Sequence, residues 1–222
     1  MADSGTQDYL EKIYEQRFSS KEEYRRKIWK TLVSDWFNRY VPVQGSVLDL
    51  GCGYGEFINA IQASERYAMD LNPRSRQCLD PGVRLFQQDC SEQWPLQDDS
   101  LGLVFTSNFL EHLPTKEKIE LTIRQACRCL RPGGQFVAIG PNVKYLPGAY
   151  WDFWDHHVPL TEASLAEGLQ LAGFRIDKII PRFLPYTMAT GRQYPVFFLR
   201  AYLRCPPIWP LWGRQFLIVA SK

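Results

Sequence analysis

The sequence has few of the features that mark secreted, membrane-spanning or disulfide-stapled proteins. No stretch of its 222 residues approaches the run of about 20 apolar residues that a membrane-spanning helix needs, and its polar start carries no apolar leader. The six cysteines include no Cys-x-x-Cys pair and no regular spacing, so we expect reduced thiols. These absences predict a cytoplasmic protein.

Charge of one sign is scarce as well. The formal net charge is +2 with 23% charged residues, and no broad basic stripe is present. A dedicated nucleic-acid binder needs such a stripe for phosphates, so we expect no nucleic-acid partner. The length is sufficient for one domain with a substantial core.

The order of the predicted elements indicates the fold class. Residues 7–16 and 21–40 form a helical preface, with Ser20 and Glu23 at capping-box spacing. From residue 46, short β-rich runs alternate with helical stretches, which is typical of βαβ units and a parallel sheet. The predicted strands occupy residues 46–50, 66–70, 83–88, 101–106, 135–140, 174–180 and 214–220. The clearest predicted helices occupy residues 115–130 and 162–172, the latter capped by Thr161.

The first predicted strand runs into a glycine-rich turn in "VLDLGCGYGEF". Gly51, Gly53 and Gly55 leave bare backbone between that strand and what the pattern predicts is a helix start, an arrangement suited to a ligand. A dinucleotide fingerprint would have a third glycine where Glu56 stands, and a pyrophosphate is repelled by a carboxylate. The acidic residue favours a cationic ligand without phosphate, such as S-adenosylmethionine.

Three further strand ends carry residues suited to that cofactor. Asp70, about 20 residues beyond the turn, is placed to accept from both ribose hydroxyls, unless it only caps the turn "DLNP". Asp89 and the Cys90 N–H are placed to meet adenine, unless Asp89 is an ordinary loop carboxylate. Asn108, in "TSNF", offers acceptors to the cofactor's ammonium group.

Together, "VLDLGCGYGEF", "YAMDLNP", "QQDCSEQWP", "FTSNFLEHLP" and "LRPGGQFVAIGPN" resemble the class I S-adenosylmethionine-dependent methyltransferases over about residues 45–180 and the last strand. The resemblance implies an α/β, Rossmann-like, seven-stranded sheet in the order 3-2-1-4-5-7-6 with the last strand antiparallel. It also implies which residues contact each part of the cofactor. By that family's pattern, the methionine moiety is contacted by Asp49, Gly51, Cys52, Gly53 and Gly55, and the ribose by Asp70. By the same pattern, the adenine is contacted by Leu71, Asp89 and Cys90, and the ammonium group by Asn108.

The predicted organisation is an N-terminal helical extension at 1–44 and a methyltransferase domain at 45–222, with an aromatic insertion at 181–213. The insertion has three interpretations: a lid, a dimer contact, or a peripheral membrane or lipid-linked substrate contact through 195–212. The chain also resembles, more loosely, methyltransferases encoded beside bacterial glycan-assembly enzymes. A monomer and a homodimer both fit the sequence.

The segment "YWDFWDHHVPLT" is the predicted acceptor side. His157 or His156 serves as a general base in one interpretation and as loop scaffold in the other. The predicted substrate pocket takes residues from this segment, from the preface and from the end of the fourth strand: Tyr14, Arg17, His112, Tyr150, Trp151 and Trp154. His112 and its neighbour Glu111 have capping and loop anchoring as the alternative.

These features predict an enzyme that methylates an oxygen of a small molecule or glycan, with S-adenosylmethionine as cofactor and S-adenosylhomocysteine as product. N- or C-methylation and a non-catalytic cofactor-binding module are the alternatives. Asp152, Asp155, His156 and His157 also carry the oxygen and nitrogen donors of a metal site, but methyl transfer from a sulfonium requires no metal. We therefore expect none.

Overall fold

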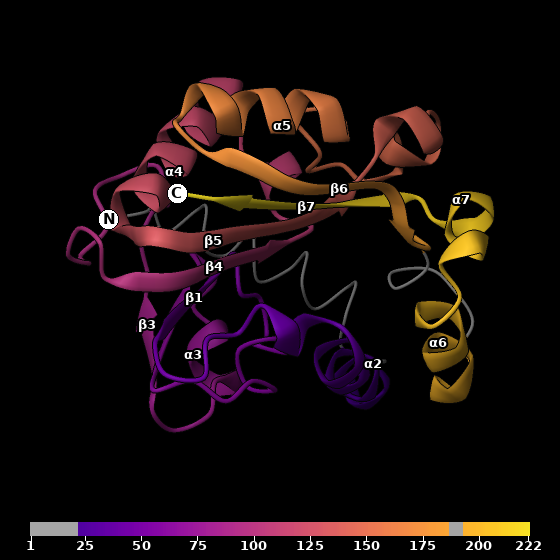
Figure 1. Ribbon diagram of the computed structural model, residues 1–222, viewed down its shortest axis with the longest axis horizontal. Helices are drawn as coiled ribbons and strands as arrows, with labels where there is room; N and C mark the ends of the chain where they lie inside the picture. Colours follow the sequence, from indigo (N-terminus) through magenta and orange to yellow (C-terminus); the bar gives the residue numbers. More distant parts are fainter. Residues whose placement is uncertain (1–21, 187–192) are drawn as a thin grey trace. The chain divides into compact units, whose positions relative to one another are not determined.

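The computed structural model describes residues 22–186 and 193–222, and the chain forms two compact units (Figure 1). The first unit comprises Met1–Asp89 and Thr187–Pro206, and the second comprises Cys90–Tyr186 and Pro207–Lys222. The predicted helix at 7–16, Ser20, and the predicted pocket residues Tyr14 and Arg17 lie outside the described residues. The predicted division at residues 44 and 45 stays a prediction.

Seven strands form one sheet in the order β3-β2-β1-β4-β5-β7-β6. Both the predicted order and the predicted antiparallel last strand are confirmed, because β7 pairs antiparallel with β5 and with β6. The strands are β1 Ser46–Leu50, β2 Glu65–Met69, β3 Val83–Phe86, β4 Leu101–Ser107, β5 Leu130–Pro141, β6 Arg175–Leu184 and β7 Gln215–Ser221.

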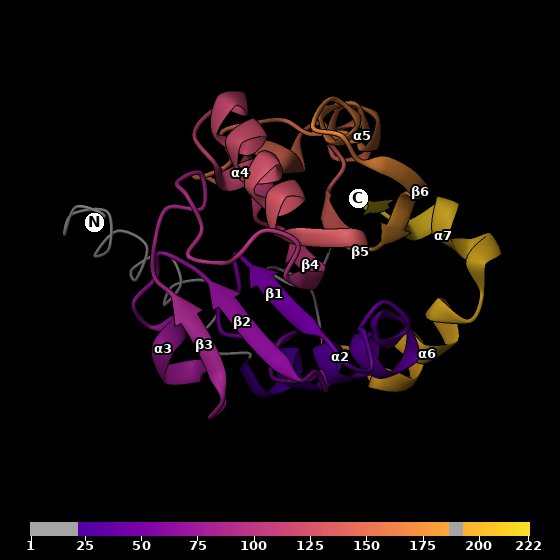
Figure 2. The same cartoon turned by 60° about the vertical axis from the view of Figure 1, so that its left-hand side comes forward.

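The first unit contains three parallel strands, visible as neighbouring arrows that point the same way in Figure 2. Every residue of β1 is buried, as expected for a central parallel strand. The helices of this unit are α2 Glu22–Asp35, η2 Phe37–Arg39, α3 Ser75–Cys78 and α6 Val196–Leu203. Helices α2 and α6 contact one another, and Arg200 pairs with Asp35 at 3.5 Å.

In the second unit, α4 and α5 cover the strands and contact each other, as Figure 2 shows. A buried stripe on α4, including Ile119, Ile123 and Ala126, explains that packing. The predicted N-cap is confirmed: Thr161 and Ser164 form a capping box at the start of α5. The helices here are η3 Leu110–His112, α4 Lys116–Cys129, η4 Val143–Tyr145, η5 Ala149–Asp152, α5 Glu162–Leu171 and α7 Trp209–Trp212, with η6 Pro206–Ile208 spanning the division between units.

Four predicted elements differ from the structure, the first being β5, which begins at Leu130 and not at residue 135. No helix follows the glycine turn: the described residues between β1 and β2 form successive turns, with a single i to i+4 bond from Asn59 N to Gly55 O. Strand β6 continues to Leu184, inside the predicted insertion, because its end still pairs with β7. The predicted helix at 21–40 ends at Asp35 and is followed by η2. None of the described helices combines the length and the apolar character needed to cross a bilayer.

Candidate active site

The glycine turn, residues 51–55, is tied to the end of β2. The N–H groups of Gly51 and Cys52 both donate to Met69 O, at 2.8 and 3.2 Å. Gly51, Gly53 and Gly55 have φ of 70°, 54° and 73°, a region that side chains disfavour. A Cβ on Gly55 would also lie 2.6 Å from Leu79 Cδ2, so at this position glycine serves the protein's own packing.

Asp70 faces the glycine turn, as the cofactor interpretation requires. Its Oδ2 accepts from the Gly53 N–H at 2.7 Å, and its Oδ1 accepts from the Asn72 N–H at 2.8 Å. The carboxylate is buried and is fixed by backbone donors from both sides. The turn-capping role considered in the sequence is therefore present, and the same bonds hold the carboxylate against the turn.

Acidic side chains gather around this turn. Burial, with the charges of Glu56 and Asp70, raises the pKa of Asp49 well above its usual range, although the Ile58 backbone donates to it. Burial also raises the pKa of Glu56, and that of the Cys52 thiol, which Asp70 and Asp49 raise further. Several negative groups held out of water favour a cation close by.

Arg25 neutralises part of this negative charge, and it is not among the site residues predicted from the sequence. Arg25 of α2 forms an ion pair with Glu56 and lies 5.4 Å from the Tyr54 ring centre. The signal for it was available: Arg25 stands four residues before Trp29 on the apolar stripe of α2, and a basic residue on a buried stripe needs a partner. The ion pair fixes the Glu56 side chain against α2 within the first unit.

The remaining predicted cofactor residues are divided between the two units. Leu71 is half-buried, and its carbonyl accepts from Gln87 Nε2 at 3.5 Å. In the second unit, Cys90 is buried and its thiol lies 3.3 Å from Thr122 Oγ1. Asn108 has a φ of 49°, and its Oδ1 is buried without a partner among the described residues, as an acceptor reserved for a ligand would be. Asp89 is half-buried at the end of the first unit.

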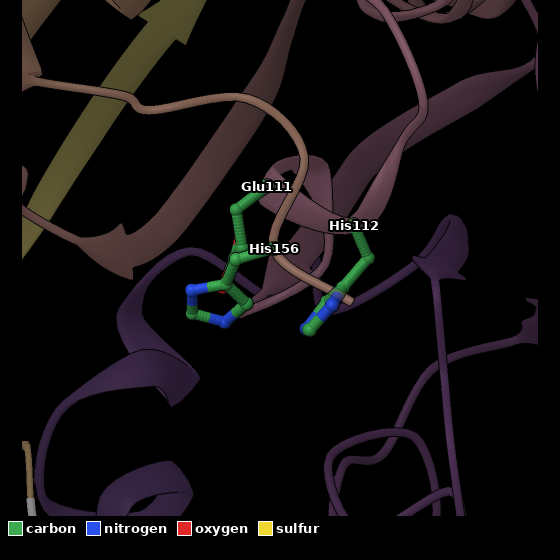
Figure 3. A group of neighbouring side chains, drawn as sticks. All are labelled: Glu111, His112 and His156. Carbon is green, nitrogen blue, oxygen red and sulfur yellow. The ribbon is translucent and has the colours of Figure 1, made fainter. Parts of the chain in front are cut away.

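The second unit brings together four polar side chains that we call the histidine cluster: Glu111, His112, Asp155 and His156. Figure 3 shows Glu111, His112 and His156 gathered at one place, the first two from η3 and the third from the segment after η5. The backbone N–H groups of His157 and Val158 donate to Glu111 O at 2.9 and 3.2 Å, which fixes that segment against η3.

Within the cluster, His112 is the histidine that a carboxylate orients. Its Nδ1 lies 3.0 Å from Asp155 O and 3.2 Å from Asp155 Oδ2. Burial lowers the pKa of His112, but the hydrogen bonds that it donates to Asp155 and the charges of Glu111 and Asp155 outweigh that effect, so the pKa is raised. Burial raises the pKa of Glu111 to about 7.

The two histidines predicted as base occupy different surroundings. His156 is 5% exposed, and its ring packs against Phe153 and Tyr150, with centroids 5.0 and 4.6 Å apart. The side chain of His157 is exposed, outside the cluster. The role of either as a base stays a prediction. Asp155 lies against His112, which was predicted to line the substrate pocket and not to act as the base.

The predicted aromatic pocket residues differ in how far they are buried. Tyr150 is fully buried, and its hydroxyl donates to Val158 O at 2.5 Å, so it supports the loop. Trp151 and Trp154 are 53% and 85% exposed. Their contact with a substrate stays a prediction, while the buried Tyr150 has a structural role that the sequence pattern alone did not indicate.

Comparisons with known proteins agree with this fold. The family model described as "Methyltransferase domain" matches residues 22–179. A crystal structure of a SAM-dependent methyltransferase from Archaeoglobus fulgidus superposes with a TM-score of 0.69 at 23% identity, covering 92% of this chain and 99% of that chain. That match shows the fold.

Two curated relatives are similar in sequence. A malonyl-[acyl-carrier protein] O-methyltransferase of Methylococcus capsulatus is 32% identical over 186 residues, which cover 75% of this chain and 66% of the relative. A probable S-adenosylmethionine-dependent methyltransferase of Mycolicibacterium smegmatis is 27% identical over 163 residues, covering 67% of this chain and 62% of the relative. The chain therefore spans less than two thirds of each relative's length. The predicted family is confirmed, and the predicted enzyme class and cofactor are those of this family: the chain belongs to the class I S-adenosylmethionine-dependent methyltransferases.

Proposed function

We propose that the protein transfers the methyl group of S-adenosylmethionine to an oxygen atom of a small molecule or glycan. The acceptor oxygen attacks the methyl carbon, a C–O bond forms, and the C–S bond breaks with its electron pair retained by sulfur. S-adenosylhomocysteine leaves as a neutral thioether, and the hydroxyl proton passes to a base or to water. Because the carbon is already activated, the protein mainly aligns the reactants and excludes water.

The observation that carries this proposal is the group of buried acids around the glycine turn. Asp49, Glu56 and Asp70 are each at least nine-tenths buried in the first unit, where Arg25 pairs with Glu56. A sulfonium and an ammonium group would relieve this excess of negative charge, whereas a pyrophosphate would add to it. We assign Asp49, Gly51, Cys52, Gly53 and Gly55 to the methionine moiety and Asp70 to the ribose.

The name of one relative supports oxygen as the acceptor atom. The Methylococcus relative is named an O-methyltransferase, and its match extends over 75% of this chain. Neither relative is named for a glycan substrate, so the glycan acceptor, the lipid-linked form of it and the base among His156 and His157 stay predictions. Nitrogen and carbon acceptors are the competing outcomes.

Cofactor binding tests the first half of the proposal. Isothermal titration calorimetry of the full chain should show binding of S-adenosylmethionine and S-adenosylhomocysteine and none of NAD. Asp70→Asn replaces an acceptor of two backbone N–H groups, so we expect at least about a tenfold loss of cofactor affinity. Asp80→Asn makes the same change on an exposed side chain of the same unit and should leave the affinity unchanged. NAD binding without a response to the other two would contradict the proposal.

The acceptor atom is tested with cofactor carrying a ¹³C-labelled methyl group. The chain is incubated with hydroxylated small molecules, glycans, lipid-linked sugars and nucleic acid, and S-adenosylhomocysteine formation selects the substrate. The carbon chemical shift of the product then shows whether the label is attached to oxygen. A label on nitrogen or carbon would refute O-methylation, and cofactor binding without turnover on any class would favour the non-catalytic module.

A further inference from the structure

We propose that Glu111, His112 and His156 form a binding site for a divalent transition-metal ion. Two histidines and one carboxylate are a donor set that such ions take up, with positions left over for water or a substrate oxygen. Each of the three offers one ligand atom, and these atoms lie within 4.8 Å of one another (Figure 3). The site does not depend on which atom of the acceptor is methylated.

The orientation of His112 suits a metal ligand. Its Nδ1 lies 3.0 Å from the carbonyl oxygen of Asp155, and a carbonyl oxygen can only accept, so Nδ1 carries the proton. The neutral ring then has its lone pair on Nε2, which has no hydrogen-bond partner among the described residues. Metal-bound histidines are typically held in this way, by a carbonyl or carboxylate on the other ring nitrogen.

Glu111 supplies an independent indication of a missing cation. The residue is 1% exposed, and its Oε1 has no hydrogen-bond partner in the part of the chain that the structure describes. No lysine or arginine of that part pairs with it either. A buried carboxyl oxygen without a partner is costly, and a cation bound between Glu111 and the two histidines would satisfy it.

The backbone keeps the three ligands together. Glu111 and His112 are consecutive in η3, and the segment that carries His156 is bonded to Glu111 O through the N–H groups of His157 and Val158. Metal–ligand distances of about 2.1 Å separate neighbouring ligand atoms by about 3 Å, so side-chain movements of about 1–2 Å would close the site. This set of ligands differs from the metal site considered from the sequence. In that site Asp152 and His157 are exposed, and Asp155 accepts a hydrogen bond from His112.

Calorimetry of the metal-free full chain with MnCl₂ tests the site. We choose Mn²⁺ because the chain has six free cysteines, which Zn²⁺ would also bind, whereas Mn²⁺ prefers nitrogen and oxygen ligands. We expect one ion per chain, and weaker binding of Mg²⁺, which prefers oxygen ligands alone. Glu111→Gln and His156→Gln should each weaken Mn²⁺ binding by at least about tenfold.

His157→Gln is the matched control, because His157 neighbours His156 but its side chain is exposed; Mn²⁺ affinity should not change. Circular dichroism and melting of each metal-free variant check the fold, and Glu111→Gln, which is nearly isosteric, decides the result if His156→Gln unfolds. The proposal is overturned if Mn²⁺ shows no saturable binding, if Glu111→Gln binds as the natural chain does, or if His157→Gln loses the ion.

Discussion

At the scale of single residues, the first unit places buried acidic side chains around the glycine turn, residues 51–55. Asp49 lies on a fully buried strand, and the charges of Glu56 and Asp70 add to the effect of burial on its pKa. A side chain that is expensive to ionise is tolerated at a functional site when its ligand is a cation. The free-energy cost of ionising Asp49 should therefore destabilise the cofactor-free protein, and the bound cofactor should remove it.

Asp49→Asn should change both the stability of the cofactor-free chain and its affinity for the cofactor. A raised folded-state pKa means that the stabilising contribution of protonated Asp49 is complete at low pH and is lost as the pH rises through that value. Above it, the cofactor-free variant should unfold with a higher free energy than the natural chain, because asparagine carries no charge that burial destabilises. Cofactor affinity should fall by about tenfold or more, because a negative partner of the sulfonium is lost.

Urea unfolding and calorimetry across pH measure these effects. In the natural chain the cofactor's positive charge favours ionised Asp49, so cofactor affinity should increase as the pH rises from the residue's ordinary pKa of 3.8 towards its raised one. Asp49→Asn should flatten that increase. An unstable variant with unchanged cofactor affinity would show that Asp49 serves the fold alone.

At the scale of elements, α5 fixes the end of the segment that carries the histidine cluster. Thr161 Oγ1 accepts from Ser164 N at 3.0 Å, and Ser164 Oγ accepts from Thr161 N at the same distance. Immediately before the helix, Leu160 O accepts from Val143 N at 3.1 Å, and Tyr150 donates to Val158. The cap therefore joins a regular helix to a loop held at several points.

Thr161→Ala should lower the free energy of unfolding by about 1 kcal/mol, since it removes one acceptor of the capping box. For a chain of this size the melting temperature should fall by about 2–4 °C, measured by differential scanning calorimetry. Thr161→Ser keeps the hydroxyl and should retain most of the stability. Equal losses in both variants would assign the effect to the threonine methyl group.

Helix α6 lies within the predicted aromatic insertion, and its role stays open. Its Phe197 and Phe198 are 70% and 58% exposed, and Arg204 just beyond it is exposed as well. Aromatic and basic side chains of this kind are compatible with the predicted peripheral membrane contact through 195–212. That contact, the lid and the dimer interpretation remain predictions.

At the scale of the whole molecule, a cofactor that binds only the folded chain should stabilise it by mass action. S-adenosylhomocysteine at about 100 times its dissociation constant should add about 2.7 kcal/mol, which raises the melting temperature measurably, whereas NAD at the same concentration should not. Differential scanning fluorimetry with both compounds checks this. Asp70→Asn should show a smaller shift with S-adenosylhomocysteine, and an equal response to NAD would contradict the family's cofactor chemistry in this chain.

The sequence by itself determined the strands and indicated the cofactor class, because periodicity, glycine positions and the acids at strand ends are local properties of the chain. The order of the strands followed from the resemblance to the methyltransferase family. The sequence also located the cap at Thr161, from the residue types at the start of the helix. Its error after Gly55 has a physical cause: "GEFINA" has helical periodicity, but the three positive φ values and the packing of Gly55 on Leu79 replace a helix start with turns.

Only the tertiary structure decided the partners of the buried polar groups. Arg25 and Glu56 are 31 positions apart in the sequence, and His112 and Asp155 are 43 apart, so no local pattern joins either pair. Folding brings Asp155 to His112, a histidine that follows another strand. Burial makes such pairings decisive, since a polar group removed from water must find its partner in whatever the fold places beside it.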